Sequence, residues 1–361
     1  MNDANELISF IASMSGEGNL RVEENLGEGY VRLRVSEAER RQAKHDIQHV
    51  EDIVIEMLRN ARDAGADKVY LATTKEDGVR TLVFLDNGSG VPQDMQERIF
   101  DARVTSKLES MKMDRWGVHG RGMALFSIKQ NTDEARVVAS DVDLGSVFKV
   151  SVGTDRLGER ADQSSWPQAV KDEDGHYVCA RGPHNIIRAA CEFALEELRA
   201  CDVYLGSPSE IAATLHAQAS SRLDASRLLF IDDEAELPVV DRLGLASDAE
   251  DFIRICSGLG LEMSERTAHR ILAGQIKPVR SVTARLLRER DSSSHASAPV
   301  DLAKDRRGLR IAKDDMAQFS RAVERDFNDL ASRYYLNLCG DPKIRVSRDR
   351  ITVTFDLAKE E

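Results

Sequence analysis

Apolar residues between positions 50 and 61 recur at intervals of three and four, which predicts an amphipathic helix with one buried stripe. Gly65 follows and can end the helix. Glu56, Asn60 and Asp63 stand at i, i+4 and i+7, so they share a second face beside the stripe. Such an acid–amide–acid face can hold a hydrated Mg²⁺, which takes few protein oxygens and fills its shell with water and phosphate. The alternative interpretation is a surface helix with a polar face.

Strand patterns surround this helix. Residues 30–35 alternate between apolar and polar, and two further pairs of runs, 68–74 with 79–86 and 134–140 with 146–152, read as paired strands. The sequence therefore predicts an α+β fold: an α/β sandwich with a mixed sheet and helices on one face. A mainly helical region and a small tail of one helix and a β-hairpin are expected to follow.

The second half of the chain divides by composition. Capping boxes at Ser207–Glu210 and Ser247–Glu250 mark helix starts, and residues 154–176 are polar. The expected division is an N-terminal arm (1–29), the α/β domain (30–153), a linker (154–176), a helical domain (177–291) and a C-terminal helix with a β-hairpin (301–361).

Composition sets broad limits. The chain has 361 residues, 42% of them hydrophobic, which is enough for two or three domains. It contains no apolar run of membrane-spanning length and no signal-peptide pattern at its start, so we expect a cytoplasmic protein without membrane contact. Cys179, His184, Cys191 and Cys201 could be drawn as a zinc site. Their spacing fits no common zinc pattern, and buried free thiols are the preferred interpretation.

Three motifs follow the helix in order. They are the strand end and turn Asp86-Asn87-Gly88-Ser89-Gly90, the glycine-containing segment from Thr105 to Gly122, and the strand start Gly145-Ser146-Val147-Phe148. With the E-x-x-x-N-x-x-D-A helix, this order resembles the GHKL (Bergerat-fold) superfamily of ATPases. That superfamily includes gyrase-type topoisomerases, heat-shock chaperones, sensor histidine kinases and MutL. The resemblance covers residues 30–153 and is closest to the MutL and topoisomerase-type ATP-binding domains.

The resemblance implies roles for the helix and the turn. Glu56 would be the general base that activates water, Asn60 would bind Mg²⁺, and Asp63 would support the metal shell or the nucleotide. Asp86 would accept the exocyclic amine of adenine, which selects ATP over GTP. The two glycines of the turn, Gly88 and Gly90, would let the backbone pass close to the base.

The resemblance also implies a lid over the triphosphate. Thr105 and Lys107 would contact the phosphates, and Ser146 matches the small hydroxyl of the final strand motif. Three glycines would let the lid fold, and the helix after them would point its free N–H groups at the phosphates: Gly117, Gly120 and Gly122. A solvated lysine and plain turns are the alternatives.

The expected function is Mg²⁺-dependent ATP binding with slow hydrolysis, in which lid closure changes the contacts of the C-terminal region or of a second protomer. Gyrase and MutL carry a β-rich transducer domain after the ATPase domain. Here the region that follows is predicted to be helical, so turnover is expected to be slow. Two alternatives stay open. One is a regulatory module that binds ATP without hydrolysing it, and the other is a serine protein kinase of the anti-sigma-factor type. Homodimerisation or a protein partner is expected.

The net charge is −12, yet seven basic residues and one acid lie between positions 266 and 290. Within residues 251–290, two helical patterns joined by a glycine turn resemble a helix-turn-helix. Five side chains would contact duplex DNA: Arg266, Thr267, Arg270, Lys277 and Arg280. The alternative is a pair of bundle helices with a solvated basic face.

Overall fold

The computed structural model describes residues 22–106, 112–114, 117–119, 122–160, 162–223 and 233–287, with short pieces of the tail between 316 and 359. The chain forms two compact units, Met1–Asp291 and Ser292–Glu361. None of the described helices is long and apolar enough to cross a membrane.

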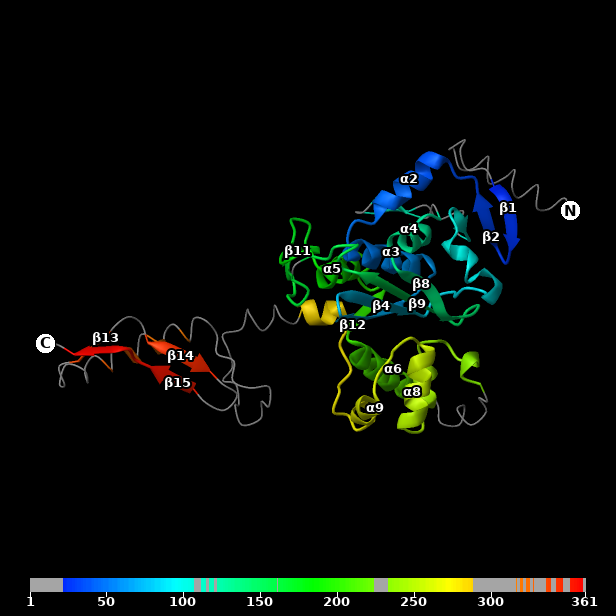
Figure 1. The fold of residues 1–361 in the computed structure, drawn as a ribbon. Coiled ribbons are helices and arrows are strands. Elements are labelled where there is room, and N and C mark those ends of the chain that lie inside the picture. The colour runs from blue at the N-terminus through cyan, green and yellow to red at the C-terminus, as the bar shows by residue number, and fades with distance from the viewer. Residues whose placement is uncertain are drawn as a thin grey trace. The chain divides into compact units, whose positions relative to one another are not determined.

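The first unit is built on a mixed sheet of five strands in the order β12-β3-β4-β9-β8 (Figure 1). The strands are β3 (Lys68–Glu76), β4 (Val79–Asp86), β8 (Glu134–Ser140), β9 (Ser146–Gly153) and β12 (Asp202–Gly206). Neighbours in the series β3-β4-β9-β8 run antiparallel, whereas β12 pairs in parallel with β3. The predicted mixed α/β architecture is confirmed.

One face of the sheet is covered by three helices, α3 (Val50–Asp63), α4 (Ala124–Asn131) and α5 (Ile186–Glu196) (Figure 1). Side chains from α3, such as Ile53 and Leu58, are fully buried against sheet residues such as Leu71 and Leu82. The predicted apolar stripe of α3 therefore forms the centre of this core, and its polar face is left for another use.

The other face is covered as well. Helices α6 (Pro208–Arg222), α8 (Ala249–Gly258) and α9 (Glu265–Leu272) share a second core with the opposite side of the same strands (Figure 1). Successive β3 residues alternate between the two cores: Val69 and Leu71 face the first, Tyr70 and Ala72 the second. Residues beyond 177 thus supply both an edge strand and a helical layer to the sheet that residues 30–153 begin.

An N-terminal hairpin adds a separate small sheet. Strands β1 (Val22–Gly27) and β2 (Tyr30–Leu33) pair with each other, and β5 (Val104–Thr105) pairs with β2. Helix α2 (Glu37–Asp46) follows, and its capping box joins Ser36 to Glu39. The hairpin thus anchors the start of the segment that sequence analysis assigns to the lid.

The remaining elements of the first unit are short. They are hairpin β6 (Lys112–Asp114) with β7 (Gly117–His119), hairpin β10 (Gln168–Lys171) with β11 (Tyr177–Arg181), and the 3-10 turns Gln93–Met95, Arg98–Phe100, Glu234–Glu236 and Arg242–Leu245.

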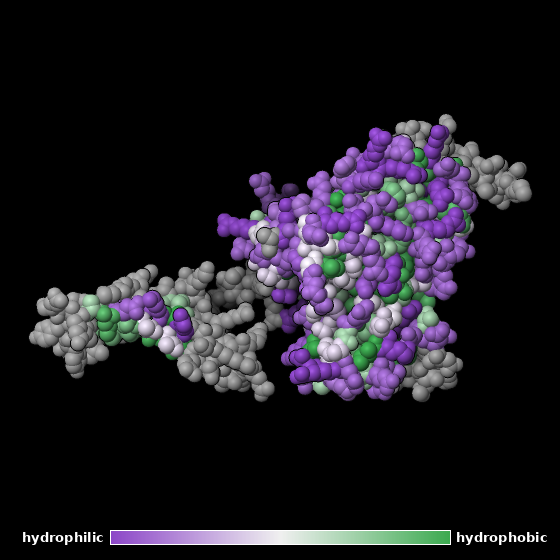
Figure 2. Space-filling view, viewed as in Figure 1, coloured by the Kyte–Doolittle hydropathy of each residue, from purple (hydrophilic) through white to green (hydrophobic). Residues whose placement is uncertain are grey.

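In the second unit, β14 (Lys343–Val346) pairs with β15 (Ile351–Thr354), and β13 (Leu336–Leu338) with β16 (Leu357–Lys359). Hydrophilic side chains cover most of the described surface on the face shown in Figure 2.

Candidate functional site

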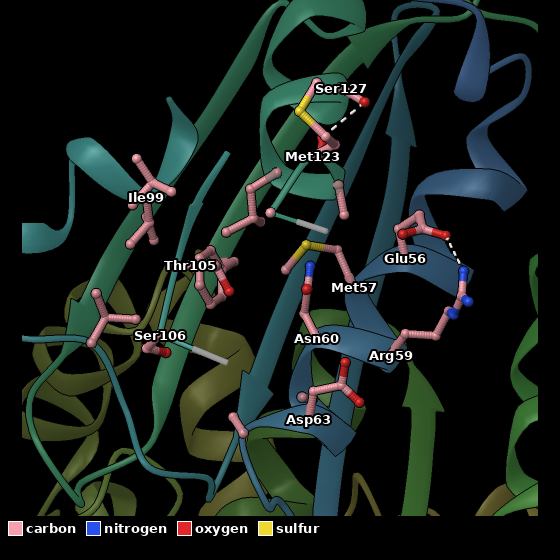
Figure 3. A pocket seen from close by; sticks show the side chains of 18 of the residues that line it. Glu56, Met57, Arg59, Asn60, Asp63, Ile99, Thr105, Ser106, Met123 and Ser127 are labelled. Carbon is pink, nitrogen blue, oxygen red and sulfur yellow. Dashed lines mark hydrogen bonds and ion pairs between the residues drawn. The ribbon is translucent and has the colours of Figure 1, made fainter. Parts of the chain in front are cut away.

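A cavity of about 470 Å³ lies beside the polar face of α3 (Figure 3). This volume is in the range of small-molecule sites. Its apolar lining comes from several elements, including Met57 of α3, Phe84 of β4, Phe148 of β9 and Ile99 of the 3-10 turn before β5. The cavity therefore combines an apolar interior with one strongly polar wall.

The structure brings most of the predicted site residues to this cavity. Its lining includes eight of them: Glu56, Asn60, Asp63, Asp86, Gly90, Thr105, Gly122 and Ser146. Gly88 adjoins Asp86 and the end of α3 without lining the cavity. Gly117 lies in β7. Lys107 and Gly120 lie outside the described residues.

The polar wall comes from one face of α3. Glu56, Asn60 and Asp63 project from it in succession along the cavity, as Figure 3 shows. This placement follows from helical periodicity, because the neighbouring face of α3 is packed in the core. A single amide oxygen between two carboxylates suits a hydrated Mg²⁺, which accepts one or two protein ligands and keeps waters or phosphates in the rest of its shell.

A buried carboxylate and a buried hydroxyl meet at the sheet end of the cavity. Asp86 and Ser146 are directly opposite each other in the β4–β9 register and are 4% and 3% exposed. The Asp86 Oδ1 atom accepts a hydrogen bond of 2.9 Å from the Gly88 N–H, which holds the carboxylate in place. A carboxylate fixed in an apolar pocket can accept a hydrogen bond from an N–H group of a ligand.

The turn after Asp86 has no room for larger residues. Gly90 has a φ of +70°, and a Cβ there would lie 1.8 Å from the Asp141 carbonyl oxygen. At Gly88 a Cβ would lie 2.8 Å from the Ala64 carbonyl oxygen. Both glycines are thus required for packing of the turn against α3 and the β8–β9 loop.

The N-terminal hairpin positions the opposite wall. Thr105 pairs with Val31 of β2, and Gly122 accepts a hydrogen bond of 2.8 Å from the Arg103 N–H. The Arg103 side chain pairs with Glu39 of α2. Burial raises the pKa of Tyr30, which also lines the cavity, although a hydrogen bond with Ser106 opposes the shift. Residues 22–46 thus contribute directly to the site.

A buried ion cluster that was not predicted from the sequence lies beside the polar wall. Arg59, Arg62 and Asp114 are 3%, 6% and 5% exposed, and Asp114 lies within 2.9 Å of Arg59 and 3.1 Å of Arg62. Burial alone would lower the pKa of Arg62, but its hydrogen bonds with Asp63, Asp114 and Glu197 outweigh this and raise it. The sequence contained one sign of this cluster: two arginines stand three residues apart in a mostly apolar helix, and buried arginines need carboxylate partners.

The predicted DNA-contacting residues lie elsewhere. Arg266, Arg270, Lys277 and Arg280 are exposed, whereas Thr267 is half-buried and its hydroxyl lies 3.0 Å from that of the N-cap residue Ser264. Helix α9 belongs to the layer on the second face of the sheet, and α3 belongs to the layer on the first (Figure 1). The basic surface and the cavity are therefore on opposite sides of the sheet.

Comparison with known proteins finds relatives for part of the chain. Residues 47–138 match the family described as histidine kinase-, DNA gyrase B- and HSP90-like ATPases. The DNA mismatch repair protein MutL of Staphylococcus aureus, in strains Newman, JH1 and Mu3, is 30% identical over 142 residues, which cover 35% of this chain and 21% of MutL. The chain thus spans about a fifth of the length of these relatives. The predicted resemblance is confirmed for the matched segment: residues 47–138 correspond to a GHKL-type ATPase domain, and domains of this type bind ATP.

Proposed function

We propose that the protein binds ATP with Mg²⁺ in the cavity beside α3 and hydrolyses it slowly. The proposal rests on one observation: the acidic face of α3 and the buried Asp86–Ser146 pair line the same cavity of a GHKL-type domain. The two groups lie at different parts of the lining, as the phosphates and the base of one nucleotide would require.

The sheet end of the cavity would bind the adenine. Asp86 would accept a hydrogen bond from the exocyclic amine, and the adjacent apolar residues Phe84 and Phe148 would contribute contact area. Guanine has an oxygen where adenine has this amine, and two acceptors would face each other. The site would therefore prefer ATP to GTP.

The α3 side would carry the chemistry. Asn60 would supply one oxygen to Mg²⁺, which would neutralise charge on the phosphates when bound. Glu56 would take a proton from the attacking water, because its carboxylate is 21% exposed and one oxygen is already fixed by Arg59 at 2.6 Å. Asp63 would hold water near the metal ligand.

The opposite wall would face the triphosphate. Thr105 and the backbone at Gly122, just before α4, lie in the lining and can donate hydrogen bonds to phosphate oxygens. The roles of Lys107, Gly117 and Gly120 in a closing lid stay predictions, as does the coupling of closure to a second protomer or another partner.

The test separates binding from turnover. We expect wild type and Glu56→Gln to bind ATP alike, while the substitution lowers ATP turnover about a hundredfold or more, as loss of a general base does. Asn60→Ala should weaken Mg²⁺-dependent binding. ATP binding without turnover in the wild type would favour the regulatory module, and transfer of labelled phosphate to a serine of a partner would favour the kinase.

A second candidate function is contact with duplex DNA through α9 and the segment after it. The exposed guanidinium and ammonium groups of Arg266, Arg270, Lys277 and Arg280 favour it, since phosphate contacts of this kind supply most non-specific affinity. The test is the affinity for duplex DNA over a salt series, with ATP turnover measured alongside. Arg266→Glu and Arg270→Glu, tested singly, should each weaken binding, while Arg136→Glu on the exposed edge strand β8 makes the same change of charge and serves as the matched control. Equal losses of DNA affinity in the α9 variants and in the control would show that overall charge, and not a surface on α9, determines binding.

A further inference from the structure

Asp114 joins two buried arginines of α3 to a different part of the chain. The Nε and Nη2 atoms of Arg59 donate to its two carboxylate oxygens, both at 2.9 Å, and Arg62 Nη1 donates to Oδ2 at 3.1 Å. Asp114 ends β6, and 55 residues separate it from Arg59. Buried charges need partners, and this carboxylate lets two guanidinium groups lie one helical turn apart.

Each arginine also holds one acid of the polar wall. Arg59 Nη1 donates to Glu56 Oε1 at 2.6 Å, an interaction marked in Figure 3. Arg62 Nε donates to Asp63 Oδ1 at 3.0 Å. The metal-ligand candidate Asn60 lies between these two acids on α3. Both acids beside Asn60 are thus oriented by arginines that share one carboxylate from β6.

We propose that Asp114 is a positioning residue for ATP hydrolysis, acting on Glu56 through Arg59; the inference rests on the proposed function. Without the Asp114 carboxylate, Arg59 loses two charge-assisted hydrogen bonds and turns its remaining N–H groups toward Glu56. A carboxylate held by more than one N–H group is drawn away from the attacking water. Nucleotide binding does not need this orientation, because Asp86 and the phosphate contacts come from other elements.

The primary test compares Asp114→Asn with Glu197→Gln. Each substitution removes one negative charge from the same cluster, and in the described part of the chain Glu197 pairs with Arg62 at 3.2 Å. We expect Asp114→Asn to lower kcat for ATP about tenfold, the effect of losing one hydrogen bond to a charged group, with KM changed less than about twofold. Glu197→Gln should keep kcat within about twofold of wild type. Equal losses in both variants, or a matching rise in KM, would overturn the proposal.

A double-mutant cycle tests the route through Arg59. Arg59→Gln should itself lower kcat, and adding Asp114→Asn should then change kcat by less than about twofold, because the intermediary is already absent. Full additivity would show that Asp114 acts by another route and would overturn the proposal.

Hydrogen exchange gives a readout that does not depend on turnover. Peptides covering β6 should exchange faster in Asp114→Asn than in Glu197→Gln, since only the former releases β6 from α3. Unchanged exchange would show that the contact does not hold β6 and would overturn the inference on its own. If wild type binds ATP without hydrolysing it, the hydrolysis proposed above fails, and the exchange result still decides whether Asp114 ties β6 to α3.

Discussion

At the residue scale, Asp86 is the cavity side chain proposed to recognise the adenine base. It ends a buried strand, one oxygen is fixed by the Gly88 N–H, and Ser146 stands opposite it. Asp86→Asn keeps the size of the side chain but replaces a charged acceptor with a neutral one. We expect ATP affinity to fall about ten- to a hundredfold, the equivalent of about 1.5–3 kcal/mol for a hydrogen bond to a charged group. Titration of ATP into each protein measures this.

The matched control is Asp143→Asn, which makes the same chemical change in the exposed β8–β9 loop. Asp143 does not line the cavity, and its φ of +60° suits asparagine well. Its ATP affinity should stay at the wild-type value. A similar loss in both variants would mean that general charge, and not the adenine contact, governs affinity.

At the residue level, helical spacing was enough to predict the geometry of one wall, while the roles of its side chains stay predictions. Glu56, Asn60 and Asp63 share a helix face by periodicity, and the structure places all three on the cavity. The contact between Arg59 and Asp114 was not predicted, because the two residues are 55 positions apart and Asp114 lies in an aperiodic segment. Periodicity carries no information about such long-range pairs.

At the element scale, the turn that follows β4 depends on Gly90. Its left-handed backbone and the nearby Asp141 carbonyl oxygen leave no space for a Cβ. Gly90→Ala should therefore lower the free energy of unfolding by more than the roughly 1–2 kcal/mol of left-handed strain alone, because the β8–β9 loop must also shift. Thermal or urea unfolding measures the difference.

Gly78 provides the comparison. It has a φ of +80° in the β3–β4 turn, and nothing lies within 4 Å of the position that a Cβ would occupy there. Gly78→Ala should show only the strain, roughly 1–2 kcal/mol. Equal destabilisation of the two variants would show that contact with Asp141 adds nothing.

Element prediction was strongest for strands with a clear alternation. The runs at 68–74, 79–86, 134–140 and 146–152 correspond to β3, β4, β8 and β9. β12 and its parallel pairing with β3 were not foreseen, because a five-residue strand between helices has little pattern of its own. Its place is set by burial of Val203 and Leu205 in the first core, which is a tertiary effect.

At the scale of the whole molecule, the central strands are buried on both faces, and among the described residues the second face is covered by those beyond 177. Val83 and Leu85 of β4 contact the layer formed by α6, α8 and α9. A fragment of residues 1–160 would therefore expose an apolar sheet face and lose the edge strand β12. The sequence prediction of separate domains at 30–153 and 177–291 stays a prediction, and it bears directly on this fragment.

We expect a fragment of residues 1–291 to unfold cooperatively and to bind ATP like the full chain, because it contains the whole first unit. The fragment of residues 1–160 should be aggregated or unfolded at the same temperature, since exposed apolar area of this kind destabilises by roughly 25 cal/mol per Å². Circular dichroism melts and gel filtration of both fragments provide the measurement. A monomeric 1–160 fragment that melts at the full-chain temperature and binds ATP would show that the ATPase domain folds without its second helical layer. The contacts between α6, α8, α9 and the sheet would then be a docking interface between independent domains, and the basic surface of α9 could move relative to the nucleotide cavity.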